Sequence, residues 1–93
     1  MIIGMLVLDL FNEQFHSLKE KRQLLSSLKK RLKNKFNIAV AESDCQELWQ
    51  KAQLAVVSLG ANQAIVEHTF KAIEDFIYLN YDVQITQMKI RYL

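Results

Sequence analysis

The residues of this chain best suited to chemistry are basic, and they are concentrated in one segment. Ser17–Phe36 holds eight of the twelve lysine and arginine residues but a single acid, Glu20, so its charge is +7. The four bases and nine acids elsewhere sum to −5, a polarity that the formal net charge of +2 conceals. Clustered basic side chains bind polyanions because they displace counterions from phosphates. The eight bases are Lys19, Lys21, Arg22, Lys29, Lys30, Arg31, Lys33 and Lys35.

Helical spacing orders these basic residues. Ser17 and Glu20 form a capping box in which Glu20 is expected to accept from the Ser17 amide. Lys21 falls within the apolar stripe, so its ammonium group must either extend to solvent or pair with an acid. The stripe consists of Leu18, Leu25, Leu28, Leu32 and Phe36. The bases that share one flank, spaced to follow a phosphate backbone, are Arg22, Lys29 and Lys33.

Several interpretations of this helix remain open. One is that its bases are solvated charges, which Glu42, Asp44 and Glu47 balance across the fold. Others are binding of a small phosphorylated ligand near the helix N-terminus, or of an acidic protein. We favour contact with RNA or a ribosomal particle. The contacts are then expected from Lys19, Lys21, Arg22, Lys29, Lys30 and Lys33.

Trp49 is the single tryptophan, and it lies in the polar segment Asp44–Gln50. A tryptophan beside a strand usually anchors a turn or an interface, although its ring also suits stacking on a base. His16, His68 and Cys45 lack the spacing of metal ligands, so we expect neither a metal nor a cofactor. Because Cys45 is alone, we expect no intrachain disulfide and a reducing compartment.

Four strand patterns and two helices follow in the order βαββαβ. The helices begin at the capping residues Ser17 and Asn62. The strands are expected at Ile2–Asn12, Asn37–Asp44, Lys51–Leu59 and Val83–Leu93, the last with a bulge where its apolar phase shifts. Two right-handed split βαβ units of this order form a ferredoxin-like α+β plait, with both helices on one face of a four-stranded antiparallel sheet. We expect one such domain over residues 1–93.

Apolar residues lie on both faces of the first strand. One set, around Gly4, faces the helices, and the glycine either lets a helix approach closely or marks a bulge. The other set lies on the face that the helices leave uncovered. An exposed apolar face usually marks an interface. We therefore expect a homodimer through Ile3, Met5, Val7 and Phe11.

Catalysis is not expected. The loop Phe11–Ser17 lacks the glycines with which ferredoxin-like acylphosphatases hold phosphate, and Arg22 lies inside a helix. The chain shows no Ser-His-Asp order, and its third strand lacks the aromatic signature of an RNA-recognition motif. No apolar run approaches the roughly 20 residues of a membrane span. The expectation is a non-enzymatic cytoplasmic protein with no membrane partner.

Three motifs resemble those of the YlxP-like family of small bacterial proteins: His16–Arg22 (HSLKEKR), Lys35–Asn37 and Glu42–Gln50 (ESDCQELWQ). The resemblance covers essentially the whole chain. It implies a cytoplasmic, ferredoxin-like protein with no established function and no catalytic residues. Genes of the family often neighbour those of transcription and translation factors, which implies an association with RNA or the ribosome. The block that it identifies is His16, Ser17, Lys19, Lys21, Arg22 and Trp49.

Overall fold

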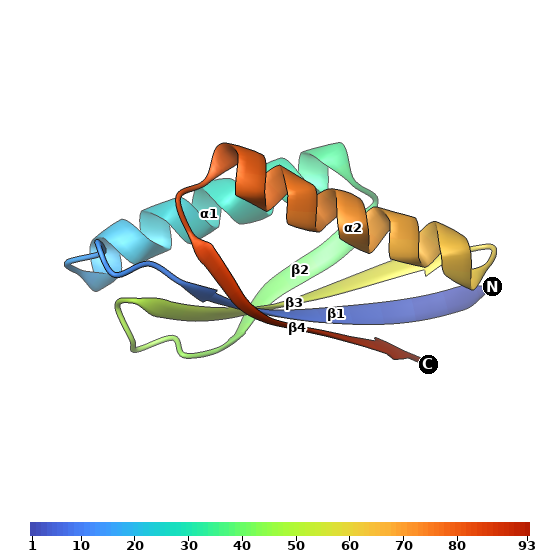
Figure 1. Ribbon diagram of the computed structural model, residues 1–93, viewed down its shortest axis with the longest axis horizontal. Helices are drawn as coiled ribbons and strands as arrows, with labels where there is room; N and C mark the ends of the chain where they lie inside the picture. Colours follow the sequence, from blue (N-terminus) through green and yellow to red (C-terminus); the bar gives the residue numbers. More distant parts are fainter.

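The computed structural model describes all 93 residues and contains six elements in the predicted order (Figure 1). The strands are β1 (Ile2–Phe11), β2 (Ile38–Asp44), β3 (Lys51–Gly60) and β4 (Gln84–Tyr92). The helices are α1 (Leu18–Lys35) and α2 (Gln63–Asn80), which lie side by side on one face of the sheet. All strand pairs are antiparallel, in the order β2-β3-β1-β4. The predicted ferredoxin-like fold is confirmed.

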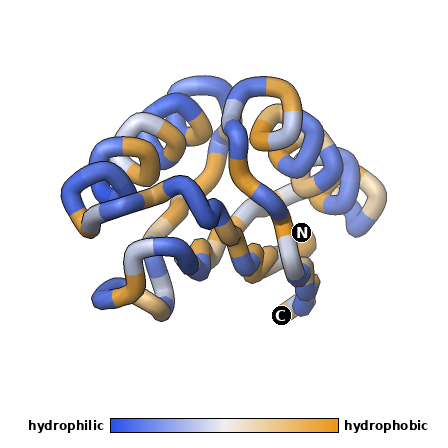
Figure 2. Tube along the Cα trace, turned by 60° about the vertical axis from the view of Figure 1, so that its left-hand side comes forward, coloured by the Kyte–Doolittle hydropathy of each residue, from blue (hydrophilic) through white to orange (hydrophobic).

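Alternation along β1 places the core between the sheet and the helices. Leu6, Leu8 and Leu10 face the helices and are almost completely buried. The same sheet face receives Leu54 and Val56 from β3. Both helices add apolar side chains, so that 15 buried residues form one cluster. Figure 2 shows the resulting layers, with polar positions on the outer surfaces of the helices. Neither helix is long and apolar enough to cross a membrane.

Gly4 lets α2 pack directly on the sheet. A Cβ atom at this position would lie 2.6 Å from Cγ1 of Val66 and 3.1 Å from Cε2 of Phe70, so a larger residue could not fit without movement. Of the two roles predicted for Gly4, close approach of a helix is the correct one, because the pairing of β1 with β3 shows no register shift at Gly4.

The predicted bulge in β4 is confirmed. The register of β4 against β1 shifts after Asp9 and leaves Thr86 as the extra residue.

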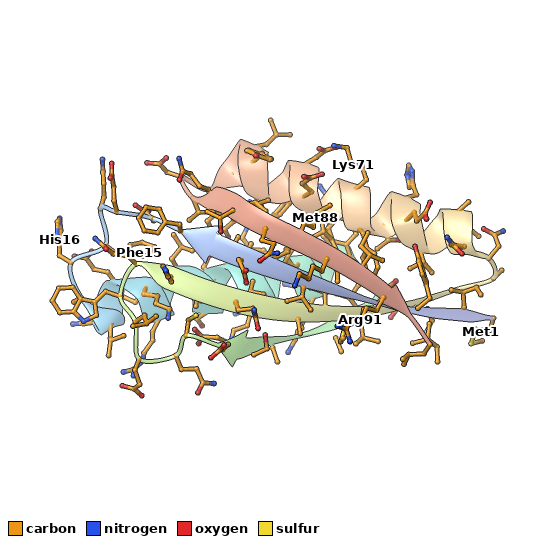
Figure 3. All side chains as sticks on the ribbon, turned by 60° about the horizontal axis from the view of Figure 1, so that its bottom comes forward. Met1, Phe15, His16, Lys71, Met88 and Arg91 are labelled. Carbon is orange, nitrogen blue, oxygen red and sulfur yellow. The ribbon has the colours of Figure 1, made fainter.

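The sheet face away from the helices is uncovered, and Figure 3 turns it toward the viewer. It carries the residues expected to form a dimer interface, all of them half-buried: Ile3, Met5, Val7 and Phe11. Beside them on β3 are Val57, 37% exposed, and Leu59, 53% exposed. Lys89 and Arg91 of β4 pair with Val7 and Met5 and share this face, so bases border an apolar strip.

We expect Gly4→Ala to lower the free energy of unfolding by about 1–3 kcal/mol, because the added methyl group overpacks the contact with Val66. Urea denaturation followed by circular dichroism measures the loss. Val66→Ala removes the obstructing atom, so the double variant should lose less stability than the two single variants together. Strictly additive losses would contradict a direct contact between these positions.

Candidate anion-binding surface on helix α1

Lys21 lies inside the protein, which corrects its predicted place on the binding surface. Its side chain is 1% exposed. The Nζ atom lies 3.0 Å from Oε2 of Glu42 and donates to the carbonyl oxygens of Cys45 and Leu48, the latter at 2.7 Å. Of the two outcomes predicted for Lys21 in the apolar stripe, the structure shows pairing with an acid, Glu42. A phosphate cannot reach this buried ammonium group.

The Glu42 carboxylate meets Lys21 through charge rather than through a directed hydrogen bond. Its Oε2 atom is buried and lacks a partner with hydrogen-bond geometry, although the ammonium nitrogen is 3.0 Å away. An ammonium group has three N–H donors, and here the carboxylate and two carbonyl oxygens surround it. Loss of either charged partner would leave the other buried and unpaired.

Lys21 also holds the loop between β2 and β3 against α1. Cys45 has a left-handed backbone with φ of 63°, and its amide donates to Oδ1 of Asp44 at 2.8 Å. Its carbonyl oxygen accepts from Lys21 and, at 3.1 Å, from the amide of Leu48. A left-handed backbone is costly for a residue with a Cβ atom, and these hydrogen bonds offset that cost. The loop and the first turn of α1 are thus joined.

Two side chains, Ser17 and Glu20, bind backbone amides at the N-terminus of α1. Oγ of Ser17 accepts from the Glu20 amide at 3.2 Å, as predicted for a cap. Oε2 of Glu20 accepts from the amide of His16 at 3.2 Å, not from that of Ser17, so the predicted capping box is shifted by one residue on this side. The Glu20 charge also offsets the positive end of the helix dipole. His16 is exposed here (Figure 3), and the anion contact predicted for the helix start stays a prediction.

Two further bases of α1 contact aromatic rings near the end of α2. The guanidinium carbon of Arg31 lies 4.9 Å from the ring centroid of Phe76 and 5.3 Å from that of Tyr81. Its nitrogens donate to the Tyr81 hydroxyl at 3.1 Å and to Oδ1 of Asn80 at 3.3 Å. Nζ of Lys35 lies 4.9 Å from the Phe76 centroid. These cation–π contacts assign both bases to the packing of one helix against the other.

The remaining bases of α1 have no carboxylate partner. The ion pairs of the protein are Lys21–Glu42, Lys71–Glu74 and Lys71–Asp75. The five unpaired bases fall within an arc of about 100° on the side of the helix opposite Arg31, because each residue turns the helix by about 100°. Lys29 is half-buried and the other four are exposed. We call this set the basic surface: Lys19, Arg22, Lys29, Lys30 and Lys33.

The acids expected to balance the helix do not reach the basic surface. Glu42 forms an ion pair with Lys21, and Oδ1 of Asp44 accepts a hydrogen bond from the Cys45 amide. Glu47 is exposed and forms no ion pair. Histidine, cysteine and acidic side chains nowhere gather in a group of three that could hold a metal ion. Among the three acids, only Glu42 forms an ion pair with α1, and its partner is Lys21.

On α2, by contrast, charges are matched locally. Glu74 lies 3.1 Å from Nζ of Lys71 and Asp75 lies 3.4 Å from it, and their hydrogen bonds raise the pKa of that ammonium group. The Tyr92 hydroxyl donates to Oε1 of Glu67 at 3.1 Å, and desolvation together with this carboxylate raises the pKa of Tyr92. The one base of α2 is therefore neutralised, unlike the five on α1.

Trp49 lies on the β2–β3 loop with its side chain 54% exposed. The neighbouring Leu48 is 49% exposed, although its carbonyl oxygen is held by Lys21. The loop backbone is therefore anchored by Lys21, and Trp49 and Leu48 are each about half exposed. The predicted anchoring of a turn or an interface by the Trp49 ring stays a prediction. Leu48 was not among the residues predicted from the sequence. Its position beside Trp49 in a polar turn was the available signal.

A family profile described as "Protein of unknown function (DUF503)" matches residues 3–90. The "Uncharacterized protein YlxP" of Bacillus subtilis (strain 168) is 31% identical over 61 residues, which are 66% of each chain, just under two thirds of that relative's length. "De novo designed protein Foldit4" superposes with a TM-score of 0.53 and 9% identity, over 100% of this chain and 97% of its own. "De novo designed protein Ferredog-Diesel" superposes with a TM-score of 0.50 and 12% identity, over 96% of this chain and 83% of its own. Both likenesses support the fold alone.

We expect Lys21→Met to lower the free energy of unfolding by about 3–5 kcal/mol, because it leaves the buried Oε2 atom of Glu42 without its charged partner. Urea denaturation measures this loss, and Lys19→Met on the exposed side of the same helix serves as the control, with a change within about 0.5 kcal/mol. Adding Glu42→Leu to Lys21→Met should restore part of the stability. Equal losses for the Lys21 and Lys19 variants would show that the buried contact does not form.

Proposed function

We propose that this chain, which belongs to the DUF503 family of proteins of unknown function, binds RNA through the basic surface of α1. The resemblance to the YlxP-like family is confirmed, but neither the family description nor the relative names an activity. The proposal therefore rests on one observation: five bases on one side of α1 have no carboxylate partner. Such a surface has free charges to offer a polyanion.

The distribution of charge between the two helices supports this proposal. α1 carries eight bases and one acid, or +7, whereas α2 carries one base and three acids, or −2. The basic surface lies on the side of α1 opposite Arg31, which itself contacts the end of α2. A polyanion is thus attracted to one side of the helix layer and repelled from the other, which orients its approach.

The chemistry of the surface favours a nucleic-acid backbone over an acidic protein. Arg22 and Lys33 are separated by about 16 Å along the helix, a distance over which a chain of phosphates can meet several bases. The residues between them on the outer surface, such as Ser26 and Ser27, are polar. Protein interfaces usually have an apolar centre and are depleted of lysine, whereas phosphate contacts require neither an apolar centre nor burial.

We further propose that this binding is non-enzymatic and takes place in the cytoplasm. The basic surface holds no nucleophile beside a general base, because its only neighbouring hydroxyl groups are serines and the nearest histidine, His16, precedes the helix. The thiol of Cys45 is free, as suits a reducing compartment. The partner is then an RNA or a ribosomal particle.

As a second candidate, we propose that the uncovered sheet face binds a second copy of this chain. Four strands about 4.8 Å apart, each about 30 Å long, offer roughly 500–600 Å² per copy, or roughly 1,000–1,200 Å² in total. This is near the lower limit of a specific interface. The exposed Val57 and Leu59, beside Met5 and Ile3, give the face the apolar centre that a homodimer needs.

The double variant Arg22→Glu with Lys29→Glu should lose RNA retention without unfolding. Co-sedimentation with ribosomal particles in lysate, with and without nuclease, measures retention. In solution the dependence of log K on log salt should become shallower by at least about 1.4, since each phosphate contact on a single strand contributes about 0.7. Unfolding of the protein is checked by circular dichroism.

The control for this double variant is Lys89→Glu with Arg91→Glu on β4, which changes the net charge by the same amount. It should retain RNA more strongly than the α1 variant. Equal binding of both folded variants would sink the proposal for α1. A complex that resists nuclease would instead identify a protein partner.

For the second candidate, Val57→Lys should shift the chain toward monomer, because a two-fold interface would bring two new charges into its apolar centre. Sedimentation equilibrium over a range of concentrations measures the change, expected as an at least roughly 100-fold weaker dimer. Leu79→Lys, at an 84% exposed position on α2, is the matched control and should change nothing. A wild-type chain that stays monomeric at high concentration excludes this dimer.

A further inference from the structure

We infer that Trp49 stacks on an unpaired base, so that the ligand class of the basic surface is single-stranded RNA. This inference rests on the proposed function, because it adds a base contact to a surface that otherwise recognises phosphate. An exposed aromatic ring on a protein with a basic groove or face is the arrangement by which single strands are held. Three properties of the β2–β3 loop support it.

The first property is exposure of apolar area. The Trp49 side chain is 54% exposed and Leu48 beside it is 49% exposed. Together with Glu47, Gln50 and Lys51 they line an open hollow on the loop. The exposed ring and the neighbouring leucine thus give the loop an apolar area on which a base could stack. Lys51 and Glu47 place one positive and one negative charge in the same hollow, so the contacts with phosphate are assigned to the basic surface.

The second property is that the backbone is held on both sides of Trp49. The carbonyl oxygen of Leu48 accepts from Lys21 at 2.7 Å. That of Gln50 accepts from the Asn12 amide at 2.9 Å, and the Gln50 side-chain amide donates to the carbonyl oxygen of Glu13 at 2.9 Å. A ring on such a fixed backbone loses little conformational entropy when a base stacks on it. The fixed backbone suits a ligand platform better than a freely moving loop would.

The third property is the position of the loop relative to the basic surface. Because Lys21 binds the Leu48 carbonyl, the Trp49 loop lies beside the first turn of α1. From there the bases continue along the helix through Arg22 and Lys29 to Lys33. One strand can therefore place a base on the ring and its following phosphates along α1. In a duplex the bases are already stacked and paired, so the same ring would have no base to accept.

The test exploits the fact that Trp49 is the only tryptophan in the chain. A single-stranded 12-nucleotide oligoadenylate should quench the tryptophan fluorescence, whereas an RNA duplex of equal length should bind without comparable quenching. Fluorescence anisotropy of labelled RNA then measures affinity for the variants. Trp49→Ala should weaken single-strand binding roughly 5- to 150-fold, the effect of losing one stacked base, and leave duplex binding and the salt slope unchanged.

Two further variants serve as controls. Trp49→Phe keeps an aromatic face and should retain most of the affinity, while Leu79→Ala removes an apolar side chain at an 84% exposed position on α2 and should have little effect. If Trp49→Ala binds single-stranded RNA as tightly as wild type does, and both proteins bind duplex RNA equally well, the stacking inference is overturned. If the salt dependence is retained in that case, the proposed phosphate contact survives. If wild type binds neither RNA at low salt, the proposed function fails, and this inference fails with it.

Discussion

The ammonium group of Lys21 is enclosed by the Glu42 carboxylate and by the carbonyl oxygens of Cys45 and Leu48, and the geometry of one end of the molecule depends on it. A buried ammonium group is tolerated only when its charge and its donors are matched. The first turn of α1, the helix-facing side of β2 and the β2–β3 loop must therefore fit one another. The basic surface and Trp49 occupy fixed relative positions as a consequence.

The fold could be predicted because its signals are local. Alternation around Leu6, the caps Ser17 and Asn62, and the phase shift near Thr86 each depend on a few neighbouring residues. The site was predicted less well, because the roles of its bases depend on distant partners. Lys21 was expected either to extend to solvent or to pair with an acid, and only the register of β2 brings Glu42 to it. The aromatic partners of Arg31 and Lys35, on and just after α2, leave no periodic signal in the sequence.

The eight bases of α1 are thus divided by their surroundings rather than by their spacing. Lys21 is buried in an ion pair, Arg31 and Lys35 pack on aromatic rings, and the five bases of the basic surface have no carboxylate partner. Designed proteins share this fold at 9% and 12% identity, so the fold itself specifies no ligand. What distinguishes this chain is the difference in charge between its two helices, a property of side chains that the sheet and core do not require.

The two ends of the chain meet at the side of the sheet opposite the β2–β3 loop, where the Leu93 amide donates to the Ile3 carbonyl oxygen at 2.9 Å (Figure 1). A short linker could join them, which is the usual starting point for circular permutation. New termini are normally opened in an exposed loop, and residues 45–50 would look suitable. Here a break in the backbone would release the carbonyl groups that hold Lys21. This exposed loop is therefore a poor place for new termini.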